Sequence, residues 1–219
     1  IEIHGIDLNS SIIENKNFHQ HIFNITELSR LNEVLRDIQP EIIVHTAAIV
    51  SLMECEDNYK LVNKLHVDVT RELSKIKAKV IYISTDSVFN GIKGDYLETE
   101  IPDPLNNYAK TKYLGEIAVQ ANCNDYIIIR TNIFGFSIPL KGSIVEWAIK
   151  SFQNREEIDG FIDVFFNPIY TKHLAKRIID LIQLDYKGVI NLASLNKVSK
   201  YDFLTCIATY AGFSKAIIH

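Results

Sequence analysis

The stretch VIYISTDSVFNGIKGDYLETEIPDPLNNYAKTK, residues 80–112, decides the fold. It opens with an apolar run of strand type, residues 80–83, and Ser84, Thr85 and Asp86 follow directly. After a loop containing glycine and proline, a helix is predicted from residue 105, and Tyr108 and Lys112 share one of its faces because they are four positions apart. Ligands of open α/β sheets bind beyond the carboxyl ends of the strands. The stretch therefore predicts a proton-transfer site, in which a phenol and an ammonium lie near the end of a strand.

The remainder of the chain alternates between apolar strands and helices. Strands are predicted at residues 1–6, 19–23, 41–45, 126–129 and 189–192. Helices are predicted at residues 27–38, 58–76, 105–120, 143–152 and 171–184, and from residue 199 to a C′ glycine at 212. This alternation indicates an α/β fold with a doubly wound parallel sheet. Irregular stretches near residues 134–142 and 159–170 indicate a small substrate-binding lobe.

The composition is that of a globular protein. The 219 residues are 47% hydrophobic and 23% charged, and the net charge of -4 gives no general attraction to nucleic acid. No apolar run is long enough to cross a bilayer. The three cysteines, Cys55, Cys123 and Cys206, are far apart, which indicates reduced thiols rather than a disulfide framework or a zinc site. We expect a cytoplasmic protein with neither nucleic-acid nor membrane partners.

A set of short motifs occurs in one order along nearly the whole chain. They are VHTAA (44–48), VN (62–63), STDSVFNG (84–91), YLETEIPDPLNNYAKTKYLGE (96–116), RTNIFG (130–135) and NPIYTKHLA (167–175). On these motifs the chain resembles the extended short-chain dehydrogenase/reductase superfamily, and within it the dTDP-4-dehydrorhamnose reductase family. The ordered set is specific, whereas Tyr-x-x-x-Lys alone is weak among ten tyrosines. The resemblance implies a Rossmann-like domain over residues 1–135 and a mainly substrate-binding lobe over 136–219.

The same resemblance implies an NAD(P)-dependent reductase of a nucleotide-linked 4-keto-6-deoxy sugar, acting in the synthesis of surface polysaccharide precursors. Tyr108 would be the general acid that protonates the ketone oxygen as hydride reaches the carbon. Lys112 would lower the pKa of this phenol from about 10 and would hold the nicotinamide ribose. Thr85 would donate a hydrogen bond to the substrate oxygen. The alternative is an ordinary exposed helix pair beside a strand-end hydroxyl.

Further positions are assigned to cofactor and substrate by the resemblance. Asp7, at the end of a strand, would bind the adenosine ribose hydroxyls and repel a 2′-phosphate, which favours NAD over NADP. The implied cofactor-binding residues are Asp7, Asn24, Ile25, Thr46, Ala47, Ala48, Ile83, Ser84, Tyr108, Lys112, Asn132 and Ile133. The implied substrate-binding residues are Asn63, Asp86, Ser87, Phe89 and Asn132. For several of them an ordinary structural role is the alternative: a loop-start aspartate, tight packing of small residues, or a polar helix surface.

No metal site is predicted. His19 and His21 alternate on a predicted strand, but the sequence shows no third ligand for them. His45 lies within a buried strand run and is interpreted as a core histidine. The predicted partners are a nucleotide-sugar substrate and a second copy of the chain in a homodimer.

Two alternative functions remain open. The first is a nucleotide-sugar epimerase or dehydratase of the same superfamily, although the dehydratases carry Thr-Asp-Glu where this chain has Thr85, Asp86 and Ser87, so a base for water elimination is lacking. The second is a non-catalytic dinucleotide-binding subunit, resembling the regulatory subunit of methionine adenosyltransferase. Measuring turnover with a panel of nucleotide sugars separates an enzyme from such a subunit.

The chain lacks the Gly-rich turn that the family places after its first strand to hold the cofactor pyrophosphate. Residues 1–7 resemble the second strand of the family, so we expect the first βα unit before Ile1 and the usual C-terminal end after His219. Without the first strand, two strands of the sheet would have unpaired inner edges. We therefore expect the 219 residues by themselves to fold poorly and to bind NAD weakly.

Overall fold

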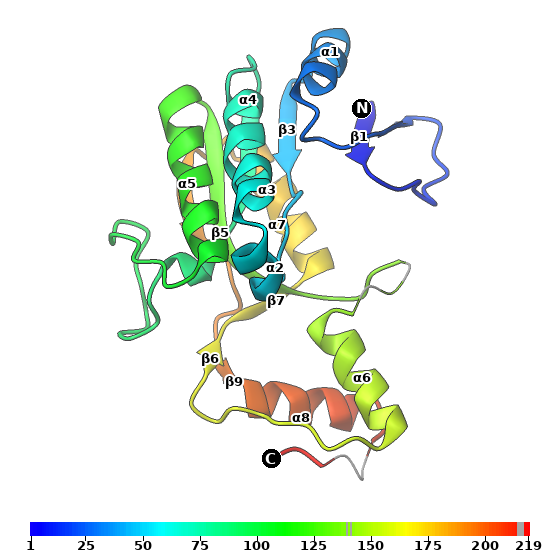
Figure 1. The fold of residues 1–219 in the computed structure, drawn as a ribbon, viewed down its shortest axis with the longest axis vertical. Coiled ribbons are helices and arrows are strands. Elements are labelled where there is room, and N and C mark those ends of the chain that lie inside the picture. Colours follow the sequence, from blue (N-terminus) through cyan, green and yellow to red (C-terminus); the bar gives the residue numbers. More distant parts are fainter. Residues whose placement is uncertain (139, 141, 214–216) are drawn as a thin grey trace. The chain divides into compact units, whose positions relative to one another are not determined.

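The computed structural model describes residues 1–138, 140, 142–213 and 217–219 (Figure 1). The chain divides into two compact units. Unit 1 consists of Ile1–Ile129 and Lys187–Ile190, and unit 2 consists of Arg130–Tyr186 and Asn191–His219. The functional division near residue 135 stays a prediction. No helix in the described part of the chain combines the length and apolarity that a membrane span requires.

Unit 1 contains two sheets. In the first, β1 (Ile3–Asp7) pairs in parallel with β2 (Phe18–Ile22). In the second, β3 (Ile42–His45) pairs in parallel with β4 (Lys79–Thr85), and β4 is followed by the first part of β5 (Tyr126–Phe134), with which β8 (Gly188–Asn191) also pairs. Every residue of β4 is buried, as in a strand covered on both faces. The predicted α/β fold with a central parallel sheet is confirmed.

The helices of unit 1 are those that the apolar spacing predicts, with two differences. The predicted helix over residues 58–76 forms as α3 (Tyr59–Asn63), the π-helix η1 (Lys64–Val69) and α4 (Thr70–Ser74). An additional helix, α2 (Leu52–Asp57), precedes it because the Ser51 side chain accepts a hydrogen bond from the Glu54 N–H at 3.3 Å. The others are α1 (Leu28–Ile38), the 3₁₀ turn η2 (Asp86–Val88) and α5 (Asn107–Asn122).

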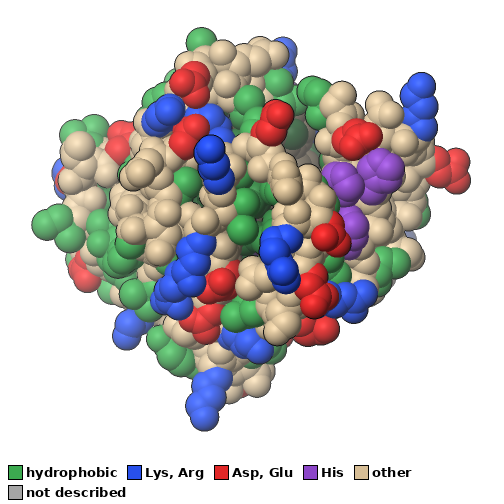
Figure 2. Space-filling view, turned by 90° about the horizontal axis from the view of Figure 1, so that it is seen from above, with side chains coloured by type: hydrophobic (Ala, Val, Ile, Leu, Met, Phe, Trp, Pro, Cys, Tyr) green, Lys and Arg blue, Asp and Glu red, His purple; other side chains and the backbone are tan. Residues whose placement is uncertain are grey.

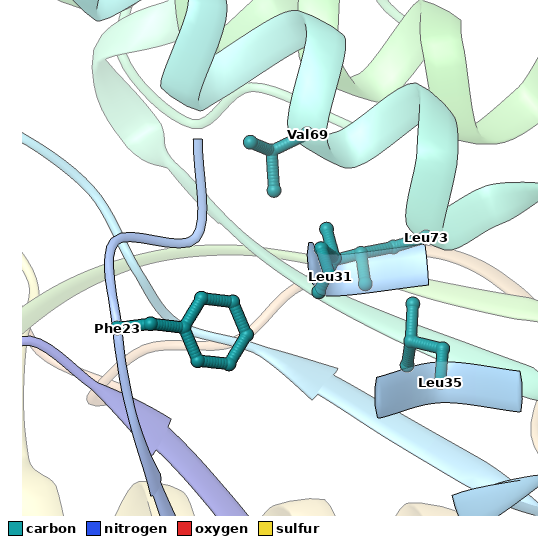
Figure 3. Close-up of a cluster of buried hydrophobic side chains, with 5 residues drawn as sticks. All are labelled: Phe23, Leu31, Leu35, Val69 and Leu73. Atoms are coloured by element: carbon teal, nitrogen blue, oxygen red, sulfur yellow. The ribbon is translucent and has the colours of Figure 1, made fainter. Parts of the chain in front are cut away.

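Two apolar clusters hold these elements together. Figure 3 shows the first, in which side chains from the residue after β2, from α1 and from the η1–α4 segment converge: Phe23, Leu31, Leu35, Val69 and Leu73. The second fixes α5 against β4 and β5, and its buried members are Val80, Tyr82, Val119, Cys123 and Ile128. The helix that carries Tyr108 is thereby attached to the strand that carries Thr85.

The approach of α5 to its neighbours is closest at Gly115. A Cβ atom at this position would lie 2.2 Å from the Tyr82 hydroxyl oxygen and 2.7 Å from the His66 carbonyl oxygen. Any side chain would therefore push α5 away from both β4 and η1. Glycine is otherwise unfavourable in the interior of a helix. The close approach of α5 to Tyr82 and His66 therefore explains why a glycine occupies this position.

Unit 2 is built on the second part of β5, which pairs in parallel with β7 (Pro168–Tyr170). This pairing explains why β5 runs to Phe134 rather than ending at residue 129 as predicted. β6 (Phe165–Phe166) pairs in antiparallel with β9 (Val198–Ser199). β6 lies within residues 159–170, which were predicted to be irregular, whereas β9 lies later in the chain. Residues 139 and 141, in the other irregular stretch, lie outside the described residues.

Three helices complete unit 2: α6 (Ile144–Asn154), α7 (Thr171–Gln183) and α8 (Lys200–Tyr210). The sequence predicts all three, and α8 also has the predicted ends. The Ser199 hydroxyl accepts a hydrogen bond from the Asp202 N–H at 2.9 Å. Gly212 has a φ of 81° and occupies the C′ position, where its N–H and that of Phe213 reach back to the last carbonyls of the helix.

We expect Gly115→Ala to destabilise the protein by about 1–3 kcal/mol, because the added methyl group overlaps Tyr82 and His66. The measurement is urea unfolding of the parent and the variant. Gln120→Ala, an exposed substitution on the same helix, is the control and should change the free energy of unfolding by less than about 0.5 kcal/mol. A stabilisation of about 1 kcal/mol by Gly115→Ala, the ordinary value for an uncrowded helix position, would contradict the close approach.

Candidate functional site

The first turn of α5 is fixed by side chains on both sides of it. The Asn106 side chain accepts a hydrogen bond from the Ala109 N–H at 2.9 Å and caps the helix. The Glu56 carboxylate of α2 accepts another from the Asn107 N–H at 3.0 Å. Tyr108 therefore projects from a turn whose backbone position is determined by its neighbours.

Thr85 and Tyr108 are brought together at the carboxyl end of β4. The Thr85 hydroxyl lies close enough to the Tyr108 phenol to lower the pKa of that phenol. The Thr85 hydroxyl oxygen also accepts the Ser87 N–H at 3.2 Å and caps η2, which holds the side chain in place. The structure thus places a phenol near a hydroxyl at the edge where ligands of such sheets bind.

Lys112 lies one turn further along α5 and is 3% exposed. Its Nζ atom is 4.1 Å from the centroid of the Tyr82 ring. Burial lowers the pKa of this ammonium from 10.5 to about 7, while the charge of Glu116 acts in the opposite direction. The Glu116 carboxylate itself accepts a hydrogen bond from the Ser84 hydroxyl at 2.6 Å.

The expectation that Lys112 lowers the pKa of Tyr108 is wrong for the protein in this form. Burial raises the pKa of the Tyr108 phenol, the hydrogen bond with Thr85 partly offsets the rise, and the charge of Asp86 adds to it. The reason is that both groups lie in a poorly hydrated environment, which disfavours the phenolate and the ammonium alike. Tyr108 is consequently protonated at neutral pH.

His66 lies against Tyr108 at the candidate site and is not among the residues predicted from the sequence. Its Nε2 atom accepts a hydrogen bond from the Ile49 N–H at 3.0 Å, so the ring proton is on Nδ1, which lies 2.8 Å from the Thr111 hydroxyl oxygen. The Tyr108 ring packs edge-on against the same imidazole, with centroids 6.1 Å apart. His66 therefore links the segment after β3 to the helix that carries Tyr108 and Lys112. Its helical spacing from Val62 and Val69, both buried, is the signal that could have identified it.

The segment predicted to contact the cofactor after β3 is partly open. Thr46 is exposed, whereas Ala47 and Ala48 are half-buried. Their small side chains leave room for close approach to the backbone, and the bond from Ile49 to His66 fixes the end of the segment. Asn63, at the end of α3, is half-buried. The roles of these residues stay predictions.

The remaining predicted residues of unit 1 have local structural explanations. Asp7 is exposed and accepts the Asn9 N–H at 2.9 Å, while Asn24 accepts the Thr26 N–H at 3.0 Å, beside a half-buried Ile25. The Asp7 and Asn24 side chains each accept a backbone N–H within a local turn. These bonds neither support nor oppose a role in ligand binding.

The residues around Thr85 are more enclosed. Ile83 and Ser84 are buried in β4. The Ser87 hydroxyl donates to the Asp86 carboxylate at 3.3 Å, and Phe89 stacks on Tyr96 with ring centroids 4.4 Å apart. Two predicted residues belong to unit 2, where they lie on β5: Asn132 and Ile133.

The environment of Lys112 fits a group that supplies hydrogen-bond acceptors. An ammonium that is buried needs an anion or several acceptor oxygens to be stable in its charged form. Among the described residues, the close partner of the Lys112 Nζ is the Tyr82 ring, and we find no hydrogen bond from it to a protein acceptor. Hydroxyl oxygens of a ribose would satisfy this need, so the residues fit a dinucleotide.

Comparison with known proteins gives one family and several relatives. The family model described as RmlD substrate binding domain matches residues 5–218. The spore coat polysaccharide biosynthesis protein SpsK of Bacillus subtilis (strain 168) is 32% identical over 204 residues, which are 90% of this chain and 70% of that protein. The methionine adenosyltransferase 2 subunit beta of Bos taurus is 31% identical over 198 residues, which are 84% of this chain and 59% of that protein.

A solved structure has the same fold. The dTDP-4-dehydrorhamnose reductase of Bacillus anthracis str. Ames, crystallised in complex with NADP, superimposes with a TM-score of 0.86 at 26% sequence identity. The match covers 100% of this chain and 85% of that one. The fold is therefore shared with a dTDP-4-dehydrorhamnose reductase.

We expect the buried His66 to make stability fall as pH falls below about 6.5. Burial lowers its pKa from 6.5 to about 3, with the Lys112 charge acting in the same direction. Between these two values the unfolded chain binds a proton that the folded protein does not, so stability decreases by about 1.4 kcal/mol per pH unit for this histidine. His66→Gln should lose this contribution, as shown by urea unfolding at pH 7, 6 and 5. His173→Gln, at an exposed position, is the control. Parallel pH profiles for the parent and His66→Gln would contradict the assignment.

Proposed function

We propose that this chain, which belongs to the RmlD substrate binding domain family, acts as an NAD(P)-dependent reductase of a nucleotide-linked 4-keto-6-deoxy sugar. The observation that carries the proposal is the proximity of Tyr108 to Thr85 at the carboxyl end of β4, with the buried Lys112 one helical turn away. The likeness to a dTDP-4-dehydrorhamnose reductase supports the same chemistry. The likeness to SpsK supports a role in making a surface polysaccharide precursor.

Tyr108 supplies the proton in the proposed reaction. A nicotinamide dinucleotide, when bound, supplies the hydride for the ketone carbon. Because burial raises its pKa, Tyr108 enters the reaction with its hydroxyl protonated and ready to donate to the oxygen that gathers negative charge. Thr85, whose hydroxyl donates to the Asp86 carboxylate at 3.3 Å in this structure, can instead donate a hydrogen bond to the same oxygen and stabilise the charge that develops there.

Lys112 has two parts in this proposal. Its ammonium would donate hydrogen bonds to the ribose hydroxyl oxygens. In this structure the ammonium instead lies over the Tyr82 ring. Acceptors for the ammonium protons favour the charged form and raise its pKa above the value of about 7 in this structure. A charged Lys112 then stabilises the phenolate that Tyr108 becomes after proton transfer.

Other residues would complete the cofactor site. The segment Thr46, Ala47 and Ala48 would face the cofactor with its backbone, and Asp7 would bind the adenosine ribose. The Asp7 carboxylate would repel a 2′-phosphate, which favours NAD, whereas the B. anthracis relative was crystallised with NADP. Comparing the KM values for NADH and NADPH measures this preference. A cytoplasmic location and a homodimer remain expectations.

A second candidate is a binding subunit without turnover. It is supported by the 31% identity to methionine adenosyltransferase 2 subunit beta, a value close to that for SpsK. The Thr85, Tyr108 and Lys112 constellation favours the enzyme because a binding subunit has no need of a buried proton donor. A dehydratase is disfavoured because Ser87 is a poor base at neutral pH.

We expect Tyr108→Phe to reduce kcat by about 10²–10⁴-fold and to leave cofactor affinity within a few-fold, since the ring is kept and the proton is lost. The measurement is oxidation of NADH or NADPH by the protein that carries this chain, with a panel of dTDP-linked and UDP-linked 4-keto-6-deoxy sugars. Tyr113→Phe, on the same helix, is the control. Activity of Tyr108→Phe near the parent level would refute the role of Tyr108. If the parent binds the dinucleotide but turns over none of the sugars, the binding subunit is the better account.

A further inference from the structure

The exposed face of the β1–β2 pair carries a cluster of histidines that plays no part in the proposed reaction. In the parallel register, His4 lies directly opposite His19. Because side chains alternate along a strand, Glu2 lies beside His4 on the same face of the sheet, and His21 lies beside His19. Two strands of unit 1 therefore bring one carboxylate and three imidazoles together.

The distances within this cluster are short. The His4 and His19 rings stack with centroids 4.9 Å apart, and the His4 Nδ1 atom is 3.1 Å from the His21 Nε2 atom. One potential ligand atom from each of Glu2, His4 and His19 lies within 4.8 Å of the other two. These three residues are exposed, and Figure 2 shows histidine side chains gathered on the molecular surface. An ion could reach them without any rearrangement of the core.

We propose that Glu2, His4 and His19 bind a divalent transition-metal ion of the zinc class. Two imidazole nitrogens and one carboxylate oxygen form a ligand set that suits Zn²⁺, with water in the fourth position. Mg²⁺ and Ca²⁺ prefer all-oxygen ligands and are disfavoured here. No metal site was predicted because His19 and His21 alone offer too few ligands. The pairing of β1 with β2 places His4 opposite His19, and Glu2 lies close to both.

His21 completes the arrangement as an outer partner. If His4 binds the ion through Nε2, its Nδ1–H is free to donate to the His21 Nε2 atom 3.1 Å away. Metal-bound histidines usually donate their second ring N–H in this way, which fixes the tautomer and the ring orientation. His4 thus has both a ligand position and the supporting hydrogen bond already in place.

Metal binding would join β1 to β2, since His4 lies on β1, Glu2 immediately precedes that strand, and His19 lies on β2. A two-stranded sheet is only marginally stable in water. In the described part of the chain, β1 and β2 pair with each other and with no further strand. The ion would therefore act as a structural clip on this pair, independent of the reductase chemistry.

The test is isothermal titration of the protein that carries this chain, produced without a histidine tag and treated with EDTA, with Zn²⁺, Ni²⁺ and Mg²⁺. We expect saturable one-to-one binding of Zn²⁺ and no binding of Mg²⁺. His4→Gln and His19→Gln should each weaken Zn²⁺ binding by at least about tenfold, and His21→Gln by about tenfold as an outer partner. His173→Gln removes an exposed histidine of unit 2 and should leave the affinity unchanged.

Two further readouts keep the proposal testable if a variant folds badly. With the unmodified chain, Co²⁺ should give the intense visible absorption of a four-coordinate site, and Zn²⁺ should slow amide hydrogen exchange in β1 and β2. Absence of saturable Zn²⁺ binding, equal binding of Mg²⁺, or an equal loss of affinity in His173→Gln would overturn the metal site. Zn²⁺ binding without any slowing of exchange in β1 and β2 would overturn its role as a clip.

Discussion

The burial of the Lys112 ammonium beneath the surface of α5 is the constraint on which the candidate site depends. A buried cation is stable only if nearby groups compensate for its lost hydration. Here the Tyr82 ring, 4.1 Å from Nζ, and the charge of Glu116 supply part of that compensation. The pKa of about 7 shows that the compensation is incomplete. The protein thus holds a group whose charged form is stabilised further when a ligand provides acceptors, which is the property expected of a cofactor-binding lysine.

The remaining site geometry follows from keeping α5 close to β4. Gly115 permits the approach, because any Cβ there would overlap Tyr82 and the backbone at His66. His66 then links α5 to the segment after β3 through Thr111 and Ile49. Since the same helix also brings Tyr108 near Thr85, a displacement of α5 would disturb Tyr108, Lys112 and the segment after β3 together.

The sequence predicts the parts of the site that depend on spacing along the chain. The four-residue interval places Tyr108 and Lys112 on one helix face, and the hydroxyl after an apolar strand places Thr85 at the end of β4. These are local regularities that periodicity reveals. Gly212 and Ser199 at the ends of α8 were predictable for the same reason, because capping uses residues close in sequence.

Features that depend on packing between distant segments were not predictable. The direction of the Tyr108 pKa shift is set by burial, and a sequence does not show how much water reaches a phenol. The role of His66 depends on Ile49 and Thr111, which are far from it in the chain. The histidines of β1 and β2 meet only because the two strands pair in one particular register. In each case the missing information is a contact made in the folded state.

The most direct test of this account is the titration of Lys112, followed by NMR of lysine side chains labelled with ¹³C and ¹⁵N and assigned with Lys112→Met. We predict a pKa near 7 for the cofactor-free protein and a clear increase when NADH or NADPH is bound. A pKa near the ordinary lysine value of about 10.4 in the free protein, or a pKa that the dinucleotide leaves unchanged, would contradict it.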